Sequence, residues 1–328
     1  MVNEADVKLF SGKCAQIFEQ VKRDIVGQEE VVENTVIAMI AGGNVLLEGV
    51  PGIGKTRLVR SLGRVFSLPF SRIQFTPDLM PADVTGTNVL EKDAQGNAAY
   101  RFQPGPIFSN IVLADEINRA TPKSQSALLE AMQEHVVTVA GEDHRLEEPF
   151  FVLATQNPIE QEGTYALPEA QVDRFMFKLI VSYPSRQDEL LILRRMAQVQ
   201  PANDITPVLS PDELRQLRLL LDDVLIEDKV QEYIVDLVAA TRDPAACGLD
   251  DLAPLIRFGA SPRATIMLAL AARANALMQQ RNYTTPNDVK AVAMDILRHR
   301  VAVTYEAEAE DISPDHIVQK ILDSVRVP

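Results

Sequence analysis

The sequence has few cysteines, a deficit of basic residues and no long apolar run, and each shortage excludes a class of protein. Cys14 and Cys247 are the only cysteines, and they lack the paired spacing of metal clusters or disulfide frameworks, which fits a reducing compartment. The 32 basic against 46 acidic side chains give a formal net charge of −14, which argues against nucleic acid as the partner because most of the surface would repel phosphate.

The N-terminal residues and the apolar runs give no sign of a membrane protein. The first ten residues lack the basic-then-apolar order of a secretory signal. No stretch approaches the roughly 20 apolar residues that a membrane-spanning helix needs. We therefore expect a soluble, cytoplasmic protein without membrane insertion.

The chain length and the apolar patterns predict two domains. At 328 residues the chain exceeds the usual size of a single core. In the first part, short apolar runs end in polar or glycine residues and alternate with helical patterns, which is typical of buried parallel strands in an α/β sheet. We expect strands at 44–49, 71–75, 110–116, 150–156 and 176–181.

After about residue 185 the apolar spacing becomes helical, which predicts an all-helical second part. The stretch 199–211 is the best candidate for a linker, so we place the domains at 1–195 and 205–328. Helix starts are marked where a hydroxyl N-cap precedes a proline at the first helical position. These pairs are Ser210-Pro211, Ser261-Pro262, Thr285-Pro286 and Ser313-Pro314.

The segment GVPGIGKT (49–56) fits the phosphate-binding pattern G-x-x-x-x-G-K-[ST], with an expected strand before it and helical spacing after it. Glycines let the backbone N–H groups turn toward the phosphates at a helix N-terminus. Lys55 should reach the β- and γ-phosphates, and Thr56 should offer its hydroxyl to Mg²⁺. The alternative is a glycine-rich turn with an exposed lysine. The expected nucleotide-binding residues here are Gly49, Val50, Pro51, Gly52, Ile53, Gly54, Lys55, Thr56 and Arg57.

Polar side chains follow two of the expected strands, where a parallel sheet opens toward its ligand-binding edge. Asp115 is expected to hold Mg²⁺ through water, and Glu116 to orient and deprotonate the attacking water. A solvated strand end is the alternative for this pair. Asn157 is expected to contact the γ-phosphate or the water, unless it only starts the turn before Pro158.

Two arginines are further candidates. Arg263 lies just inside a helix start, where the macrodipole disfavours a cation, so a phosphate partner would explain it. A surface ion pair with a nearby carboxylate is the alternative. For Arg174 two interpretations stay open, an intramolecular salt bridge with the adjacent Asp173 and an arginine finger supplied to a neighbouring subunit.

Taken together, GVPGIGKT, VLADEINRATPKSQSALLEAMQE, FVLATQNPIEQEGTYALPEAQVDRF and SPRA resemble the MoxR family of AAA+ ATPases, from about residue 22 to at least 300. The resemblance implies an AAA+ P-loop NTPase fold, with a parallel-sheet α/β domain followed by a smaller all-helical lid domain. By resemblance, IVGQEEVV (25–32) lies near the adenine, which adds Val26 and Gly27 to the site. The implied roles are Walker A for Lys55 and Thr56, Walker B for Asp115 and Glu116, sensor 1 for Asn157, arginine finger for Arg174 and sensor 2 for Arg263.

Three points stay open within that resemblance. Arg119 is a rival for the arginine finger, and Arg263 is expected to act on either its own or a neighbour's nucleotide. The segments 85–108 and 135–146 match the helix-2 insert and the hairpin before sensor 1, which in the family face the ring pore and engage the client. Both are equally compatible with ordinary surface hairpins.

The function implied by the resemblance is hydrolysis of ATP with Mg²⁺ in a homo-oligomeric ring, with a hexamer expected. The energy would remodel or mature protein clients, with a von Willebrand A domain protein as partner and metal-cofactor insertion as one form of the work. The alternatives are a chelatase-like motor, a nucleic-acid-remodelling motor and a nucleotide-gated adaptor without useful turnover.

Overall fold

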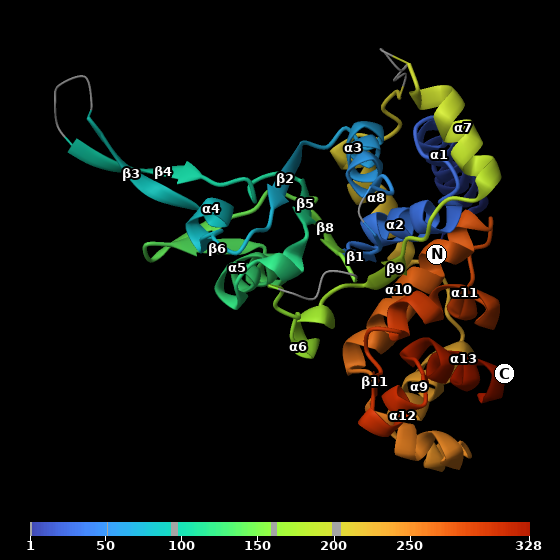
Figure 1. The fold of residues 1–328 in the computed structure, drawn as a ribbon. Coiled ribbons are helices and arrows are strands. Elements are labelled where there is room, and N and C mark those ends of the chain that lie inside the picture. Colours follow the sequence, from blue (N-terminus) through green and yellow to red (C-terminus); the bar gives the residue numbers. More distant parts are fainter. Residues whose placement is uncertain (1, 51, 93–97, 159–162, 199–204) are drawn as a thin grey trace.

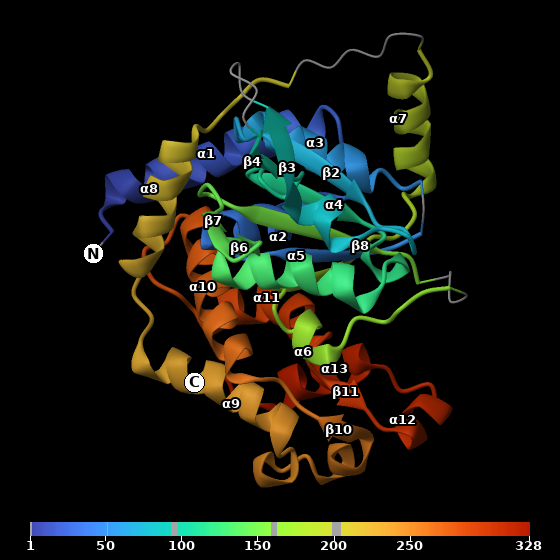
Figure 2. The same cartoon turned by 90° about the vertical axis from the view of Figure 1, so that its left-hand side faces the viewer.

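A five-stranded parallel sheet forms the centre of the molecule (Figures 1 and 2). The computed structural model describes residues 2–50, 52–92, 98–158, 163–198 and 205–328. The strand order is β2, β5, β8, β1, β9, and every neighbouring pair is parallel. All five expected strands are confirmed, as β1 (Val45–Glu48), β2 (Phe70–Gln74), β5 (Ile111–Asp115), β8 (Phe151–Gln156) and β9 (Phe177–Ile180).

Helices cover both faces of this sheet, which explains why its inner strands β5, β8 and β1 are apolar without alternation. In β5, Ile111 and Leu113 belong to the core on one face, whereas Val112 and Ala114 belong to the core on the other. Helices α1, α2 and α3 contribute to the first core, and α4 and α5 to the second. These helices are α1 (Glu4–Lys22), α2 (Glu29–Ala41), α3 (Lys55–Val65), α4 (Pro81–Thr85) and α5 (Pro122–Glu134).

The second part of the chain is helical, as expected, and all four hydroxyl-proline pairs begin helices. Ser210, Ser261 and Ser313 each accept a hydrogen bond from a backbone N–H of the first turn, and Thr285 forms a capping box with Asp288. The helices are α8 (Pro211–Asp222), α9 (Asp228–Arg242), α10 (Pro262–Met278), α11 (Pro286–Leu297), α12 (Tyr305–Ala309) and α13 (Pro314–Ser324).

The helical part packs directly on the N-terminal helices. Helix α10 contacts α1 and α2, α8 contacts α2, and α11 contacts β9. One hydrophobic core therefore runs from the sheet through α1 and α2 into the lid helices (Figure 2). The domain boundaries at 195 and 205 stay a prediction, and residues 199–204 of the expected linker lie outside the described residues.

Two antiparallel hairpins occupy the segments expected to carry inserts. The first pairs β3 (Gly86–Lys92) with β4 (Ala98–Pro104), and the second pairs β6 (Val136–Val139) with β7 (Glu142–Arg145). Figure 1 shows β3 and β4 projecting as an arm away from the helical part. Phe102 of the arm stacks on His144 of the second hairpin, with ring centroids 3.8 Å apart, so the two hairpins touch. Residues 93–97 of the expected insert lie outside the described residues.

Helix α7 (Arg186–Met196) lies apart from both cores. None of its residues is buried, and Figure 2 shows it standing beside the sheet. Among the described residues, none of the helices combines the length and apolarity that crossing a bilayer requires. A cytoplasmic location stays a prediction. The short elements are η1 (Ile117–Arg119), α6 (Glu169–Val172), η2 (Ala245–Cys247), η3 (Asp250–Leu255), β10 (Ile256–Phe258) and β11 (Ala302–Val303).

Candidate functional site

The loop between β1 and α3 forms a cradle at the carboxyl edge of the sheet, where the central strands end. Gly52 and Gly54 have φ values of 85° and 91°, which side chains with a Cβ rarely adopt. Lys55 is the first residue of α3, and its Nζ donates to the carbonyls of Gly49 at 2.6 Å and Gln156 at 3.4 Å. The lysine is thus folded back into the loop, the opposite of the exposed lysine that the alternative required. Pro51 lies outside the described residues.

The buried positive charge of Lys55 favours binding of an anion beside it. The residue is only 9% exposed, and burial lowers the pKa of its amine, while Asp115, Glu116 and Glu48 oppose that shift. A buried cation bonded to neutral carbonyls is poorly compensated. A triphosphate in the cradle would supply the missing negative charge beside the N-terminus of α3. Thr56, the next residue of this helix, is partly exposed on its first turn.

Asp115 ends β5 within reach of this lysine and is held by two neighbours. Its Oδ1 accepts from the Thr155 hydroxyl at 2.7 Å, and its Oδ2 accepts from Arg72 at 2.6 Å. Thr155 lies on β8 and Arg72 on β2, the strands on either side of β5. The carboxylate is buried, so it depends on these donors.

Glu116 is the first residue after β5, and its backbone is left-handed, with φ 57° and ψ 49°. This conformation is uncommon for a residue with a side chain and is stabilised here by contacts. The Glu116 N–H donates to the Thr155 hydroxyl at 2.8 Å, Gln74 donates to the carboxylate at 2.8 Å, and Arg119 pairs with it at 3.1 Å. Asn157 is buried directly after β8, at the same edge.

A cavity of about 480 Å³ adjoins the cradle. Val26 and Gln28 line it on one side, and Gly52, Ile53 and Gly54 on another. The size and the mixture of apolar walls and backbone suit a nucleoside. Sequence reasoning missed its remaining wall, which comes from the segment after β9 and from α7 and consists of Tyr183, Pro184, Glu189, Ile192 and Met196.

Two residues expected to contact the nucleotide instead contact side chains of their own chain. Gly27, with φ 72°, packs on Asp188 so closely that a Cβ would lie 2.8 Å from the carboxylate carbon. Arg57 lines the cavity, and its Nε donates to Asp24 at 2.6 Å. Arg57 therefore forms part of the cavity wall, whereas Gly27 packs against Asp188 beside it.

The donors at this edge fit Mg²⁺ carried in by a nucleotide. Within the described part of the chain, His, Cys, Asp and Glu side chains form no group of three or more that could hold a metal ion. Mg²⁺ retains several waters and takes only one or two protein ligands beside substrate phosphates. Thr56 and Asp115 offer one hydroxyl and one carboxylate at the cradle, which is such a set.

Arg174 and Arg263 lie at the opposite, amino edge of the sheet. The Met176 N–H, two residues after Arg174, donates to the carbonyl of Asn44, just before β1, which places this loop where β1 and β9 begin. The four residues of β1 separate the two edges by about 13 Å at about 3.3 Å per residue. Neither arginine is therefore aimed at the cradle of its own chain.

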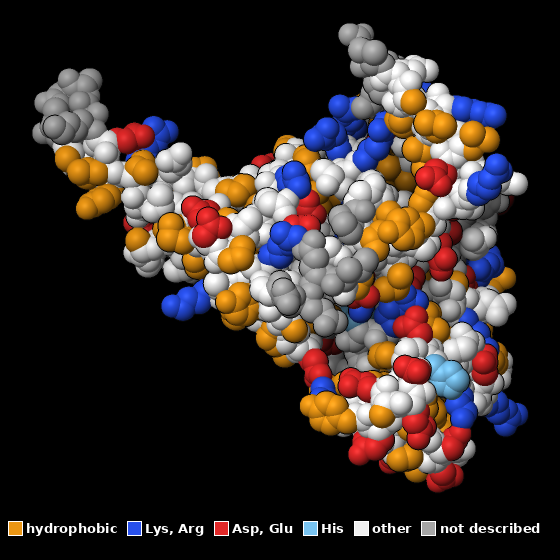
Figure 3. Space-filling view, viewed as in Figure 1, with side chains coloured by type: hydrophobic (Ala, Val, Ile, Leu, Met, Phe, Trp, Pro, Cys, Tyr) orange, Lys and Arg blue, Asp and Glu red, His pale blue; other side chains and the backbone are white. Residues whose placement is uncertain are grey.

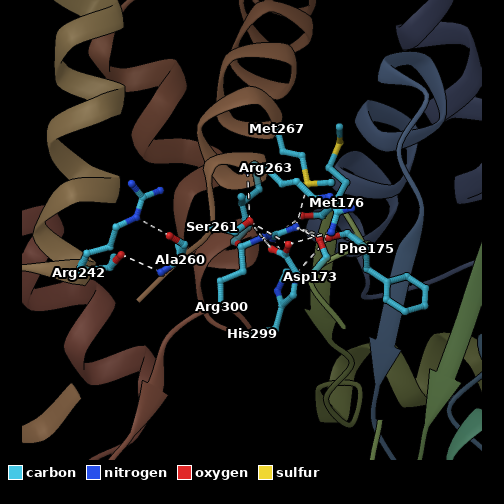
Figure 4. A network of polar contacts seen from close by, with 12 residues as sticks. Asp173, Phe175, Met176, Arg242, Ala260, Ser261, Arg263, Met267, His299 and Arg300 are labelled. Carbon is cyan, nitrogen blue, oxygen red and sulfur yellow. Dashed lines mark hydrogen bonds and ion pairs between the residues drawn. The ribbon is translucent and has the colours of Figure 1, made fainter. Parts of the chain in front are cut away.

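Asp173 ties this edge to the helical part (Figure 4). The Arg263 guanidinium pairs with Asp173 at 3.3 Å, which is the ion pair named as the alternative for that arginine. Asp173 also pairs with Arg300 and accepts from the Ser261 hydroxyl at 2.8 Å. Arg174 instead donates to the carbonyl of Leu129 on α5 at 2.6 Å, so its alternative salt bridge with Asp173 is not what the structure shows.

Sheet order explains which residues the sequence left unnoticed. Arg72 and Gln74 alternate along β2, so both point to one side, but nothing local places β2 beside β5. Thr155 lies two residues before Asn157 and reads as one more residue of a buried run. The available signals were the polar composition of β2 and the single threonine inside the apolar run of β8.

Comparisons with known proteins agree with this geometry. Residues 44–177 match the ATPase family associated with various cellular activities (AAA), and residues 251–321 match the AAA lid domain. Chaperone MoxR1 of Mycobacterium tuberculosis is 46% identical over 95% of this chain and 81% of its own length. Protein MoxR of Paracoccus denitrificans is 31% identical over 88% of this chain and 89% of its own length. A crystal structure from Cytophaga hutchinsonii superimposes with a TM-score of 0.93 at 44% identity, covering 99% of this chain and 98% of that one.

Proposed function

Since the chain belongs to the MoxR family of AAA+ ATPases and is a chaperone-like ATPase, we propose that it hydrolyses Mg-ATP at an interface between copies of itself in a ring. The observation that supports this is the split of the charged residues between two edges of one sheet. Lys55, Asp115 and Glu116 stand at the carboxyl edge, and Arg174 and Arg263 stand at the amino edge. A complete set of catalytic residues would form only when the amino edge of one copy meets the carboxyl edge of another.

At the carboxyl edge, each residue has a role that its position allows. Lys55 would leave the Gly49 carbonyl and bind the β- and γ-phosphates. Thr56 would bind Mg²⁺ directly and Asp115 through water, and this ion neutralises the charge that develops on the phosphates. Glu116 would take the proton of the attacking water once the Gln74 and Arg119 contacts rearrange, and Asn157 would orient that water or the γ-phosphate.

The amino edge would complete the site of the neighbouring copy. Arg174 serves as the arginine finger in this proposal, because Arg119 pairs with Glu116 at the carboxyl edge of its own chain. Arg263 would act on the neighbour's nucleotide rather than on its own. Two arginines delivered across the interface would link hydrolysis to contact between subunits.

The projecting arm is the surface we assign to protein clients. Leu90 and Tyr100 are directly opposite each other in the β3–β4 register, and they are 60% and 77% exposed. Figure 3 shows apolar side chains along this arm. An exposed apolar pair on a protruding hairpin is suited to grip unfolded or loosely folded chains. A hexameric ring and a von Willebrand A domain partner belong to the same proposal, and the net charge of −14 favours protein over nucleic acid.

The test of this function is the Glu116→Gln variant. We expect it to bind a fluorescent ATP analogue with Mg²⁺ as the unchanged protein does, and to release phosphate about 10²- to 10⁴-fold more slowly, because the general base is lost. Glu130→Gln, an exposed carboxylate on α5, is the matched control and should hydrolyse normally. Undiminished turnover by Glu116→Gln would remove Glu116 as the base.

A further inference from the structure

A buried arginine of the lid, Arg300, forms several hydrogen bonds to the loop that carries Arg174. Its side chain is 0% exposed, and it extends from the turn after α11 to the loop before β9 (Figure 4). Its Nε donates to Asp173 Oδ1 at 2.9 Å. One terminal nitrogen, Nη2, donates to the carbonyls of Asp173 at 2.9 Å and Phe175 at 2.5 Å, and the other donates to the carbonyl of Met176 at 3.3 Å.

These contacts bracket Arg174 in the chain. The carbonyls of Asp173 and Phe175 belong to the residues immediately before and after it, so one guanidinium holds the backbone on both sides. The planar fork of arginine carries five N–H donors, and a lysine ammonium cannot reach the same set. The pattern is that of a residue that sets the position of a neighbouring backbone.

The same network includes Arg263. Asp173 Oδ2 pairs with Arg263, while Oδ1 pairs with Arg300, and Ser261 at the start of α10 donates to both oxygens. The loop before α10 is in turn held to α9, because Arg242 donates to the carbonyl of Ala260 at 2.6 Å. One carboxylate therefore joins the loop of Arg174 to the helix of Arg263.

The ion pair is well compensated for its burial. Burial lowers the pKa of Arg300 to about 10, opposed by Asp173, so the guanidinium stays charged near neutral pH. Burial and Arg300 lower the pKa of the adjacent His299, which stays neutral. Removing one partner of such a buried pair is strongly destabilising, because the other charge is then left uncompensated.

We propose that Arg300 is a positioning residue for ATP hydrolysis at the neighbouring subunit. By holding the backbone around Arg174 and sharing Asp173 with Arg263, it presents the two arginines as one unit attached to the lid. This inference rests on the proposed action of Arg174 across the subunit interface. A movement of the lid would then withdraw or deliver both arginines together.

The test compares Arg300→Lys with Arg174→Ala in the assembled full-length protein. We expect Arg300→Lys to bind a fluorescent ATP analogue within about twofold of normal and to hydrolyse at least tenfold more slowly at saturating ATP, with KM nearly unchanged. Arg298→Lys is the matched control, since the Arg298 side chain is only 12% exposed but pairs with Asp295 and Asp315 instead of the Arg174 loop. Its hydrolysis should be normal.

Mixed assemblies separate positioning from general damage to the fold. Chains with Arg300→Lys retain their own Lys55 and Glu116, so mixing them with Glu116→Gln chains, which retain normal arginines, should restore hydrolysis. Mixing Arg300→Lys with Arg174→Ala chains should restore none. If Arg300→Lys chains do not fold, Asp173→Asn takes their place, with the same slow hydrolysis and the same restoration expected.

Three outcomes have distinct meanings. Normal hydrolysis by Arg300→Lys, or by Asp173→Asn in its place, beside a slow Arg174→Ala overturns the positioning role and leaves the proposed function intact. Slow hydrolysis that Glu116→Gln chains do not restore, although they restore Arg174→Ala, also overturns it. Normal hydrolysis by Arg174→Ala contradicts the proposed function itself.

Discussion

The carboxyl edge of the sheet carries Lys55 and two carboxylates, which are paired with Arg72 and Arg119, whereas the amino edge carries three arginines around Asp173. The carboxyl edge is built by the loops that follow parallel strands, where a helix N-terminus and strand-end acids come together. The amino edge is built where the loop before β9 meets α5, α10 and the turn after α11. In the proposed function one edge holds the nucleotide and the other completes the site of a neighbouring copy, which would make assembly a condition for catalysis.

The two edges also differ in how their key residues are held. Lys55, Asp115 and Glu116 each have a partner on a strand of the sheet, namely Gln156, Thr155 and Gln74. Arg263 and the loop of Arg174 are held through Asp173 by residues of the lid. The carboxyl edge is therefore tied to the sheet, while the amino edge is tied to the lid through Asp173 and to α5 through Arg174.

The largest expected effect comes from removing the finger. Arg174→Ala should leave nucleotide binding intact and slow hydrolysis by about 10³-fold or more, the range for arginine fingers. Phosphate release by mixtures with Lys55→Ala chains should recover in part, because the two defects lie at opposite edges of different copies. Arg119→Ala, tested in the same mixtures, should show no recovery, because Arg119 lies beside Glu116 at the carboxyl edge. If phosphate release recovers in the Arg119→Ala mixtures and not in the Arg174→Ala mixtures, Arg119 is the arginine finger and Arg174 acts within its own chain.

A smaller effect is expected at the nucleoside cavity of the carboxyl edge. Ile192→Ala should weaken binding of an ATP analogue by about tenfold, since it removes apolar wall from the cavity, with little change in hydrolysis at saturation. Leu193→Ala is the control, because this neighbour on α7 is 59% exposed and does not line the cavity. Equal affinities for the two variants, measured by titration, would show that α7 does not contact the nucleoside.

The smallest effect is a difference in stability between two helix caps. Ser313 only caps α13, whereas Ser261 caps α10 and also joins the two parts of the molecule. Ser313→Ala should lower the free energy of unfolding by about 1 kcal/mol, as loss of an N-cap usually does. Ser261→Ala should lower the free energy of unfolding by about 1 kcal/mol more than Ser313→Ala does, since the Ser261 hydroxyl also donates to Asp173. Urea unfolding of both variants measures the difference. Identical losses would show that the Ser261 contact adds no stability.

Local patterns predicted the elements well because their causes are local. Each hydroxyl-proline pair caps a helix within its own first turn, as at Ser210 and Ser313. The continuous apolar runs followed from burial on both faces of the sheet, as in β5. The phosphate-binding loop could be placed because its glycines, its lysine and the helix start are consecutive in the chain.

The partners of the site residues could not be predicted in the same way. Arg72 contacts Asp115 because β2 lies next to β5, and Ile192 lines the cavity because the chain after β9 returns past the cradle. The helix start and the resemblance both predicted a phosphate partner for Arg263, but neither could show that Asp173 pairs with it in the fold. Each of these contacts joins residues far apart in the sequence.

The sequence by itself determined the parallel strands, the capped helices and the chemistry of the phosphate-binding loop, because each depends on residues within a few positions of one another. Only the tertiary structure decided that Lys55 and Arg174 stand at opposite edges of one sheet and that Arg300 of the lid holds the loop between Asp173 and Met176. The reason is that strand order and the packing of the lid are set by the shared hydrophobic core, which no local stretch of the chain contains.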